Sequence, residues 1–180
     1  MTAWWPSSSY RIVAPLYDQS GTLVNVQARA IQPRDPRVLA PKGSRLRGSL
    51  FASSHGLEVL RGTWRGEMRV LFGEGLTDSV ALASVAPIPV LCAPGTATAR
   101  HGIGPWVEGL EVLLALDRDD AGEKALVPTA RSAFEHGAIR VRRVCWPTGC
   151  KDAVDLVQRV GLVGLWEFLS SPLPEVARGR

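Results

Sequence analysis

The sequence is poor in cysteine and contains no long apolar run. Its three cysteines, Cys92, Cys145 and Cys150, are odd in number and wrongly spaced for a disulfide framework or a zinc ribbon. This pattern favours a reducing compartment, and we expect a cytoplasmic protein. The longest apolar stretch, residues 80–94, is broken by serine and proline, so it cannot supply the roughly 20 apolar residues of a membrane span. The N-terminus has no secretory signal pattern, and no membrane partner is expected.

The composition is that of a globular chain. Of the 180 residues, 46% are hydrophobic and 21% are charged, which excludes a coiled coil, a collagen-like chain and wholesale disorder. A chain of this length corresponds to one domain with a small appendage.

Lysine is also scarce, and the net charge of +4 is carried almost entirely by arginine. Residues 1–70 contain ten basic and four acidic residues. Residues 71–136 contain four basic and nine acidic residues, and residues 137–180 contain seven basic and four acidic residues. An acidic middle between basic ends suits cations at the centre and a polyanion around it. Codon usage in a GC-rich genome explains the arginine count equally well.

The pattern of apolar residues predicts two parts. Alternation over residues 11–16 and 22–31, with a turn between, predicts a β-hairpin. A basic loop rich in proline and glycine and a short helix over residues 53–62 follow it. We therefore expect a small β-rich subdomain over residues 1–66.

The second part alternates short apolar runs with helices, which is typical of the α/β class with a parallel sheet flanked by helices. We expect this domain over residues 67–170 and a loose tail over residues 171–180. The predicted strands are residues 69–72, 89–92, 111–116 and 138–144. The predicted helices are residues 79–85 (capped by Thr77 or Asp78), 121–136, 151–159 and 162–169.

Acidic residues follow two of the predicted strands. Glu74 comes directly after the first, and Asp117 and Asp119 come after the third. If these strands are neighbours, the three carboxylates meet at the carboxyl edge of the sheet, where ligands bind in such folds. Carboxylate oxygens suit Mg²⁺ or Mn²⁺, and the Asp-x-Asp spacing lets both aspartates share one ion. Alternatively, each acid is only a turn former or a helix cap.

Four further residues are candidates for a nucleotide or phosphate site beside these acids. Gly95 and Thr96 end the second strand, where free N–H groups attract phosphate, although an ordinary strand-to-helix turn explains them equally well. Lys151 either reaches a phosphate or is a solvated surface lysine. Asp78 is the fourth candidate for this site; alternatively, it only caps a helix.

Two segments, Leu71-Phe-Gly-Glu-Gly-Leu-Thr-Asp78 and Leu116-Asp-Arg-Asp-Asp-Ala-Gly-Glu-Lys-Ala125, resemble the Toprim fold of primases, topoisomerases and related nucleases. The Ala-Gly-x-x-Ala continuation and Lys151-Asp-Ala-Val-Asp-Leu156 resemble bacterial and phage primases in particular. Upstream, residues 11–18 and Pro41-Lys-Gly-Ser44 are similar to the hairpin and basic segment that precede Toprim in those primases. The resemblance covers roughly residues 10–170.

The resemblance implies Mg²⁺-dependent nucleotidyl transfer, namely RNA primer synthesis from nucleoside triphosphates on single-stranded DNA during replication. Asp117 and Asp119 would hold the metal, and Glu74 would act as ligand or as general acid/base. Four basic residues are candidates for the nucleic-acid path, or they simply form a solvated loop: Arg29, Lys42, Arg45 and Arg47.

Two alternatives remain open at this point. The same carboxylates would serve a metal-dependent Toprim nuclease, or the chain is a non-catalytic nucleic-acid-binding subunit. The sequence lacks the zinc-binding module expected before a bacterial primase core, so a separate primase subunit or a replicative helicase is an expected partner.

Overall fold

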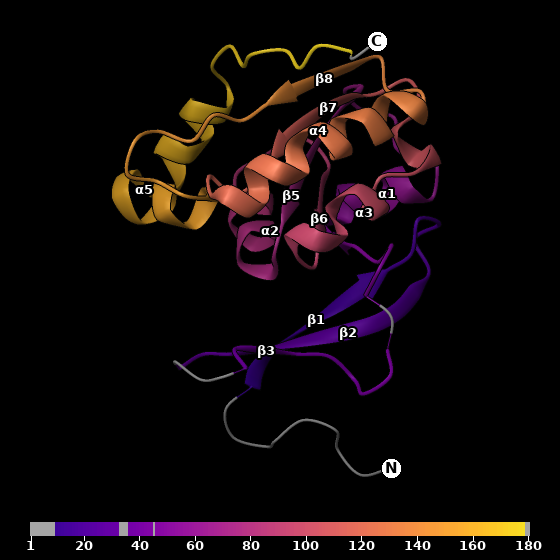
Figure 1. Cartoon of the computed structure of the whole chain (residues 1–180), viewed down its shortest axis with the longest axis vertical. Helices are drawn as coiled ribbons and strands as arrows, with labels where there is room; N and C mark the ends of the chain where they lie inside the picture. Colours follow the sequence, from indigo (N-terminus) through magenta and orange to yellow (C-terminus); the bar gives the residue numbers. More distant parts are fainter. Residues whose placement is uncertain (1–9, 33–35, 45, 179–180) are drawn as a thin grey trace.

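The structure, a computed structural model, describes residues 10–32, 36–44 and 46–178. It contains two sheets, and the smaller one projects from one end of the larger, helix-covered body (Figure 1). Arg45 lies outside the described residues. In the described part of the chain, every helix is too short or too polar to cross a lipid bilayer.

The main sheet has five strands in the order β4-β6-β5-β7-β8. Strands β5 to β8 are parallel to one another, while the short edge strand β4 is antiparallel to β6. The predicted parallel sheet is therefore confirmed, with β4 as an unpredicted addition of two residues. The strands are β4 (Phe51–Ala52), β5 (Arg69–Glu74), β6 (Val90–Ala93), β7 (Glu111–Ala115) and β8 (Arg140–Arg143).

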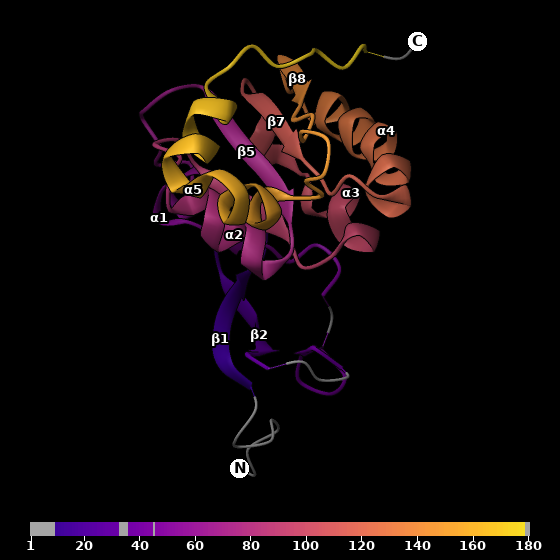
Figure 2. The same cartoon turned by 90° about the vertical axis from the view of Figure 1, so that its left-hand side faces the viewer.

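Helices cover both faces of this sheet (Figure 2). Leu71 and Leu113 face the core under α2 (Leu76–Ala83) and α5 (Ala153–Leu169). Their strand neighbours Phe72 and Val112 face the opposite core, because successive side chains of a strand point to opposite sides. That core lies under α1 (Ser54–Leu60), α3 (Ala99–Gly102), η2 (Pro105–Val107) and α4 (Asp120–Glu135), while the turn η1 (Thr96–Thr98) before α3 adds no buried residue.

The smaller sheet consists of β1 (Tyr10–Tyr17), β2 (Leu23–Ala30) and β3 (Val38–Leu39), all antiparallel. The predicted hairpin is confirmed. Its turn forms around Asp18, whose Oδ1 accepts hydrogen bonds from the N–H groups of Ser20 and Thr22. Tyr17 and Leu50 exchange two backbone hydrogen bonds of 2.8 Å, which tie the hairpin to the main body.

One predicted helix boundary differs from the structure. Helix α2 begins at Leu76 with Gly75 at its N-cap, so the capping role expected of Thr77 or Asp78 was wrong. Gly75 has a φ of 78°, which glycine adopts without strain and which turns the chain sharply from β5 into the helix. The predicted break between the two closing helices is confirmed, because α5 consists of two helical stretches separated by a kink at Gly161, whose backbone is non-helical with a φ of 75°.

The tail is not loose where it passes β8. The N–H of Arg143 donates to the Pro174 carbonyl at 2.9 Å, and the N–H of Val176 donates to the Val141 carbonyl at 2.8 Å. Residues 174–176 therefore satisfy backbone groups at the open edge of β8. The division of the chain at residues 66 and 170 remains a prediction.

Candidate metal centre

The carboxyl ends of β5 and β7 bring Glu74 and Asp117 together. The two strands are paired, with Gly73 opposite Ala115, so Glu74 and Asp117 leave neighbouring strand ends. Glu74 is only 5% exposed. Its Oε1 accepts a hydrogen bond of 2.9 Å from the Thr96 hydroxyl, while its Oε2 is buried with no hydrogen-bond partner among the described residues. Burial and the nearby charge of Asp117 raise the pKa of Glu74 to about 8.

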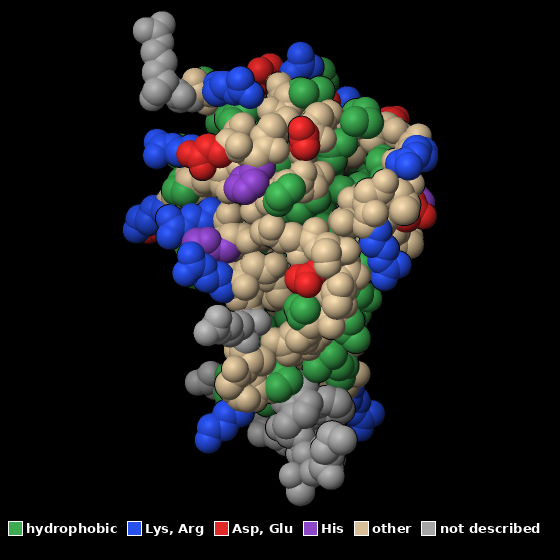
Figure 3. Space-filling model, turned by 90° about the vertical axis from the view of Figure 1, so that its right-hand side faces the viewer, with side chains coloured by type: hydrophobic (Ala, Val, Ile, Leu, Met, Phe, Trp, Pro, Cys, Tyr) green, Lys and Arg blue, Asp and Glu red, His purple; other side chains and the backbone are tan. Residues whose placement is uncertain are grey.

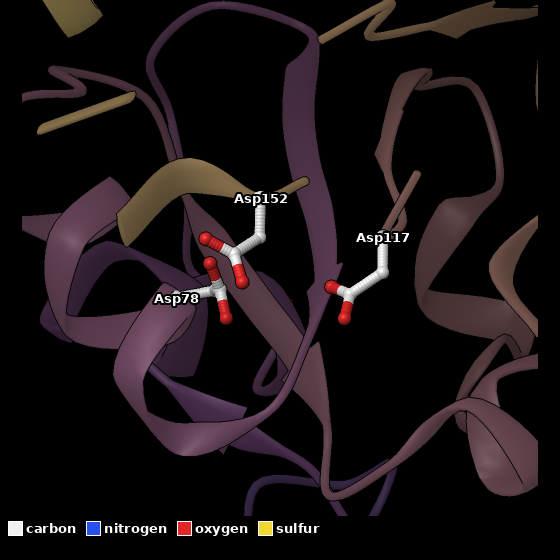
Figure 4. Close-up of side chains that lie close together, drawn as sticks. All are labelled: Asp78, Asp117 and Asp152. Atoms are coloured by element: carbon white, nitrogen blue, oxygen red, sulfur yellow. The ribbon is translucent and has the colours of Figure 1, made fainter. Parts of the chain in front are cut away.

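A second pair of acids faces Asp117 from the helices α2 and α5. Carboxylate oxygens of Asp78, Asp117 and Asp152 all lie within 4.8 Å of one another (Figure 4). Asp78 is buried on the first turn of α2 and accepts N–H hydrogen bonds from Ala153 at 3.0 Å and Val154 at 3.4 Å. Burial, followed by the charges of Asp152 and Asp117, raises the pKa of Asp78 to about 7.

Lys151 forms ion pairs with Asp117 and Asp119. Its Nζ lies 2.7 Å from Asp117 Oδ2 and 3.2 Å from Asp119 Oδ2. Asp119 also caps α4, because its Oδ1 accepts from the N–H groups of Ala121 and Gly122. These hydrogen bonds and Lys151 lower the pKa of Asp119. The Asp-x-Asp pair thus shares the ammonium group of Lys151, and the metal ion expected between the two aspartates remains a prediction.

Close packing explains why glycine stands at position 122, in the first turn of α4. A Cβ on residue 122 would lie 2.0 Å from the carbonyl oxygen of Asp117, so only glycine permits this approach. The close contact places the first turn of α4 directly against the strand end that carries Asp117, and it fixes Asp119 as the cap of the helix.

The four residues predicted for a phosphate site lie around this cluster, but three of them have protein partners. Thr96 donates to Glu74, and Lys151 pairs with Asp117 and Asp119. Asp78 lies among carboxylates, surroundings that favour contact with a cation over contact with phosphate. Gly95 stands at the end of β6 in extended conformation, with open space beside its Cα.

The predicted basic residues occupy two places. Arg29 is half-buried on β2, near enough to Asp78 and Asp152 for their charges to act on it, while burial lowers the pKa of its guanidinium. Lys42 and Arg47 are exposed in the loop that follows the hairpin. On the face seen in Figure 3, Lys and Arg side chains gather along the left edge, with two histidines among them.

Asp152 was not predicted as a site residue. It follows Lys151 and caps α5 by accepting a 2.8 Å hydrogen bond from the N–H of Asp155. The signal was present in Lys151-Asp-Ala-Val-Asp-Leu156, but nothing in that segment says that the start of α5 packs against α2. The contact between Asp78 and the first N–H groups of α5 brings Asp152 into the cluster.

The acid cluster fits a divalent metal ion. All its donor atoms are carboxylate oxygens, the ligands that Mg²⁺ and Mn²⁺ prefer. The buried Glu74 Oε2 lacks a hydrogen-bond donor among the described residues. Burial first, and then the charges of neighbouring aspartates, raise the pKa values of both Glu74 and Asp78, so a bound cation would favour the ionised form of each.

A parallel sheet with acids gathered at its carboxyl edge is the layout of α/β proteins that bind ligands at this edge. Residues 71–157 match the model of the Toprim-like family. The chain therefore carries a Toprim domain. Among curated protein sequences, none matches the chain.

Solved primase structures share the fold. The zinc-binding and RNA polymerase domains of Aquifex aeolicus primase match with a TM-score of 0.70 and 23% identity, over 93% of this chain and 41% of that one. The primase fragment of the bacteriophage T7 primase-helicase protein matches with a TM-score of 0.64 and 22% identity, over 87% of this chain and 62% of that one. A primase catalytic domain bound to single-stranded DNA matches with a TM-score of 0.68 and 21% identity, over 92% of this chain and 52% of that one. The chain has the fold of primase catalytic cores and spans about half the length of these structures.

Proposed function

We propose that the chain performs Mg²⁺-dependent nucleotidyl transfer, making RNA primers from nucleoside triphosphates on single-stranded DNA in the cytoplasm. The observation that carries the proposal is the acid cluster of Glu74, Asp78, Asp117 and Asp152 at the carboxyl edge of the Toprim sheet. The primase fold of the surrounding chain supports the choice of reaction.

Each acid has a separate part in this proposal. Asp117, Asp78 and Asp152 hold Mg²⁺ or Mn²⁺, with Asp119 at the exposed side. When bound, the metal supplies positive charge against the phosphates of the incoming nucleotide. In the metal-free protein Glu74 holds a proton at neutral pH, because its pKa is about 8. It is therefore suited to exchange a proton beside the reacting oxygens or to join the metal ligands once that proton has left.

The template path runs over basic residues of the N-terminal part. Arg29 faces the acid cluster from β2, and Lys42 and Arg47 are exposed in the following loop. Arg45 belongs to the same loop by sequence. Such residues bind the phosphates of single-stranded DNA without reading its sequence, and their contribution weakens as salt rises.

A gel assay tests the proposal directly. The protein is mixed with single-stranded DNA, labelled ribonucleotides and Mg²⁺ or Mn²⁺, beside the variants Glu74→Gln and Asp117→Asn. Labelled short RNA that falls at least about 100-fold in both variants supports primer synthesis, because the metal charge is lost with its ligands. Metal-dependent shortening of the DNA without synthesis would assign a nuclease.

A non-catalytic binding subunit is the second candidate. Lys151 already neutralises part of the charge on Asp117 and Asp119, so this half of the site holds together without a metal ion. The chain also spans only 41% of the Aquifex aeolicus structure. DNA binding that needs no metal, with neither synthesis nor cleavage even when a separate primase subunit or a helicase is added, would favour this candidate.

A further inference from the structure

The ammonium group of Lys151 contacts two of the acids that are proposed to surround the metal ion. Its Nζ lies 2.7 Å from Asp117 Oδ2 and 3.2 Å from Asp119 Oδ2. The other oxygen of Asp119 accepts the two N–H hydrogen bonds that cap α4, so the lysine holds the oxygen that the cap leaves free. One lysine of the chain therefore neutralises both acids that follow β7.

The backbone of Lys151 is fixed by hydrogen bonds on both sides. Its carbonyl oxygen accepts a hydrogen bond of 2.7 Å from the N–H of Arg118, the residue between the two aspartates. Its own N–H donates to Asp155 Oδ2 at 2.9 Å. The side chain, in contrast, is 47% exposed. Because lysine carries its charge on a flexible four-carbon stem, the ammonium group can turn into solvent while the backbone stays in place.

The same carboxylate of Asp117 also belongs to the three aspartates whose oxygens lie within 4.8 Å of one another. A divalent ion held there and the ammonium group of Lys151 would be close neighbours, and two positive charges at short range repel each other strongly. The lysine contact is weak, because its side chain is partly in water. A divalent ion carries twice the charge and has Asp78 and Asp152 as further ligands. Lys151 is therefore the weaker of the two partners of Asp117.

We propose that Lys151 is a built-in competitor of the metal ion. In the metal-free protein its ammonium group neutralises Asp117 and Asp119, and it turns into solvent when Mg²⁺ or Mn²⁺ binds. Metal uptake is therefore an exchange of one cation for another, and the lysine lowers the affinity of the acid cluster for the ion. This inference rests on the proposed function, because the competing ion is the metal that the proposed reaction uses.

Calorimetry with MgCl₂, in the absence of DNA and nucleotides, tests the competition. We expect Lys151→Met to bind Mg²⁺ at least about fivefold more tightly than the unmodified protein, because the ion no longer displaces the lysine. Lys151→Arg keeps the positive charge, so its Mg²⁺ affinity should stay within about threefold of the unmodified protein. Lys124→Met is the control, since it removes an exposed lysine of α4, and it should change the affinity less than about twofold.

Equal or weaker Mg²⁺ binding by Lys151→Met would refute the competition and would make Lys151 a residue that positions the two aspartates for the ion.

Acetylation of the unmodified protein follows the movement of the lysine itself. Lys42, Lys124 and Lys151 are the lysines of the chain, so mass spectrometry of peptides measures the rate at each one separately. We expect saturating Mg²⁺ to raise the rate at Lys151 at least about threefold, because an amine held by two carboxylates reacts slowly. Lys42 and Lys124 are exposed, and their rates should stay the same. A constant rate at Lys151 while Mg²⁺ binds would mean that the lysine and the ion share the acids, and it would refute the exchange.

These measurements separate the inference from the proposed function, because neither depends on primer synthesis. Exchange at Lys151 without any synthesis by the unmodified protein would keep the inference and refute the proposed reaction. Primer synthesis by a protein in which Mg²⁺ leaves Lys151 protected from acetylation would do the reverse. Failure of both Mg²⁺ and Mn²⁺ to bind in calorimetry would refute the exchange together with the metal centre.

Discussion

Lys151 Nζ lies 2.7 Å from Asp117 Oδ2, so a lysine at the start of α5 neutralises the acid that follows β7. We expect Lys151→Met to lower the free energy of unfolding of the metal-free protein by about 1 kcal/mol, a small value because the lysine side chain is 47% exposed. Millimolar Mg²⁺ should restore most of this loss, because the acids then bind a cation from solution. Urea unfolding with and without Mg²⁺ measures both effects.

The control is Lys124→Met, which removes an exposed lysine that has no acid partner among the described residues. It should change the free energy of unfolding by less than about 0.5 kcal/mol, with or without Mg²⁺. Equal behaviour of the two variants would mean that the contact between Lys151 and Asp117 has no measurable energy.

The raised pKa values of Glu74 and Asp78 predict how stability depends on pH. Both folded values, about 8 and about 7, lie above the ordinary values of 4.5 and 3.8. Between these limits the folded protein holds protons that the unfolded chain has released, so its stability falls as pH rises. We expect a loss of several kcal/mol, up to about 6 kcal/mol, between about pH 5 and pH 8 without metal, because both acids hold their protons over most of this range in the folded protein.

Thermal unfolding across this pH range, with and without Mg²⁺, checks the prediction. Bound Mg²⁺ should reduce the fall, because it stabilises the ionised acids. Glu74→Gln should also reduce it and should raise the melting temperature at pH 8, where a large part of the Glu74 carboxyl groups is ionised. If stability instead rises steadily from pH 5 to pH 8 in metal-free buffer, folding does not raise the pKa values of these two acids.

The sequence alone predicted the parallel sheet because its apolar runs are short, regular and separated by helical segments. It also indicated that Glu74 and Asp117 would lie close together if their strands were neighbours, and the pairing of β5 with β7 meets this condition. The partners of Lys151 and Thr96 could not be predicted, since they depend on how α5 and η1 pack against the strand ends. The position of Asp152 in the acid cluster likewise depends on how α5 packs, and the sequence alone could not predict it.

Gly122 should be far less replaceable than Gly95, although both stand near strand ends. A methyl group at residue 122 would meet the Asp117 carbonyl oxygen at 2.0 Å, whereas one at residue 95 would meet nothing within 4 Å. We expect Gly122→Ala to lower the free energy of unfolding by about 3 kcal/mol and Gly95→Ala to change it by less than about 0.5 kcal/mol. Urea titrations of both variants measure the difference, and similar losses would refute the close approach of α4 to Asp117.

Asp152→Asn tests whether the acid supplied by α5 belongs to the metal centre. Asparagine also caps helices, so the hydrogen bond from the N–H of Asp155 survives and the fold should be kept. The negative charge is lost, and we expect Mg²⁺ affinity to fall at least about tenfold in calorimetry. Asp155→Asn is the matched control, because Asp155 bonds the N–H of Lys151 and is not among the three aspartates that lie within 4.8 Å of one another. If the two variants bind Mg²⁺ equally well, Asp152 serves only as a helix cap, and the metal is held without α5.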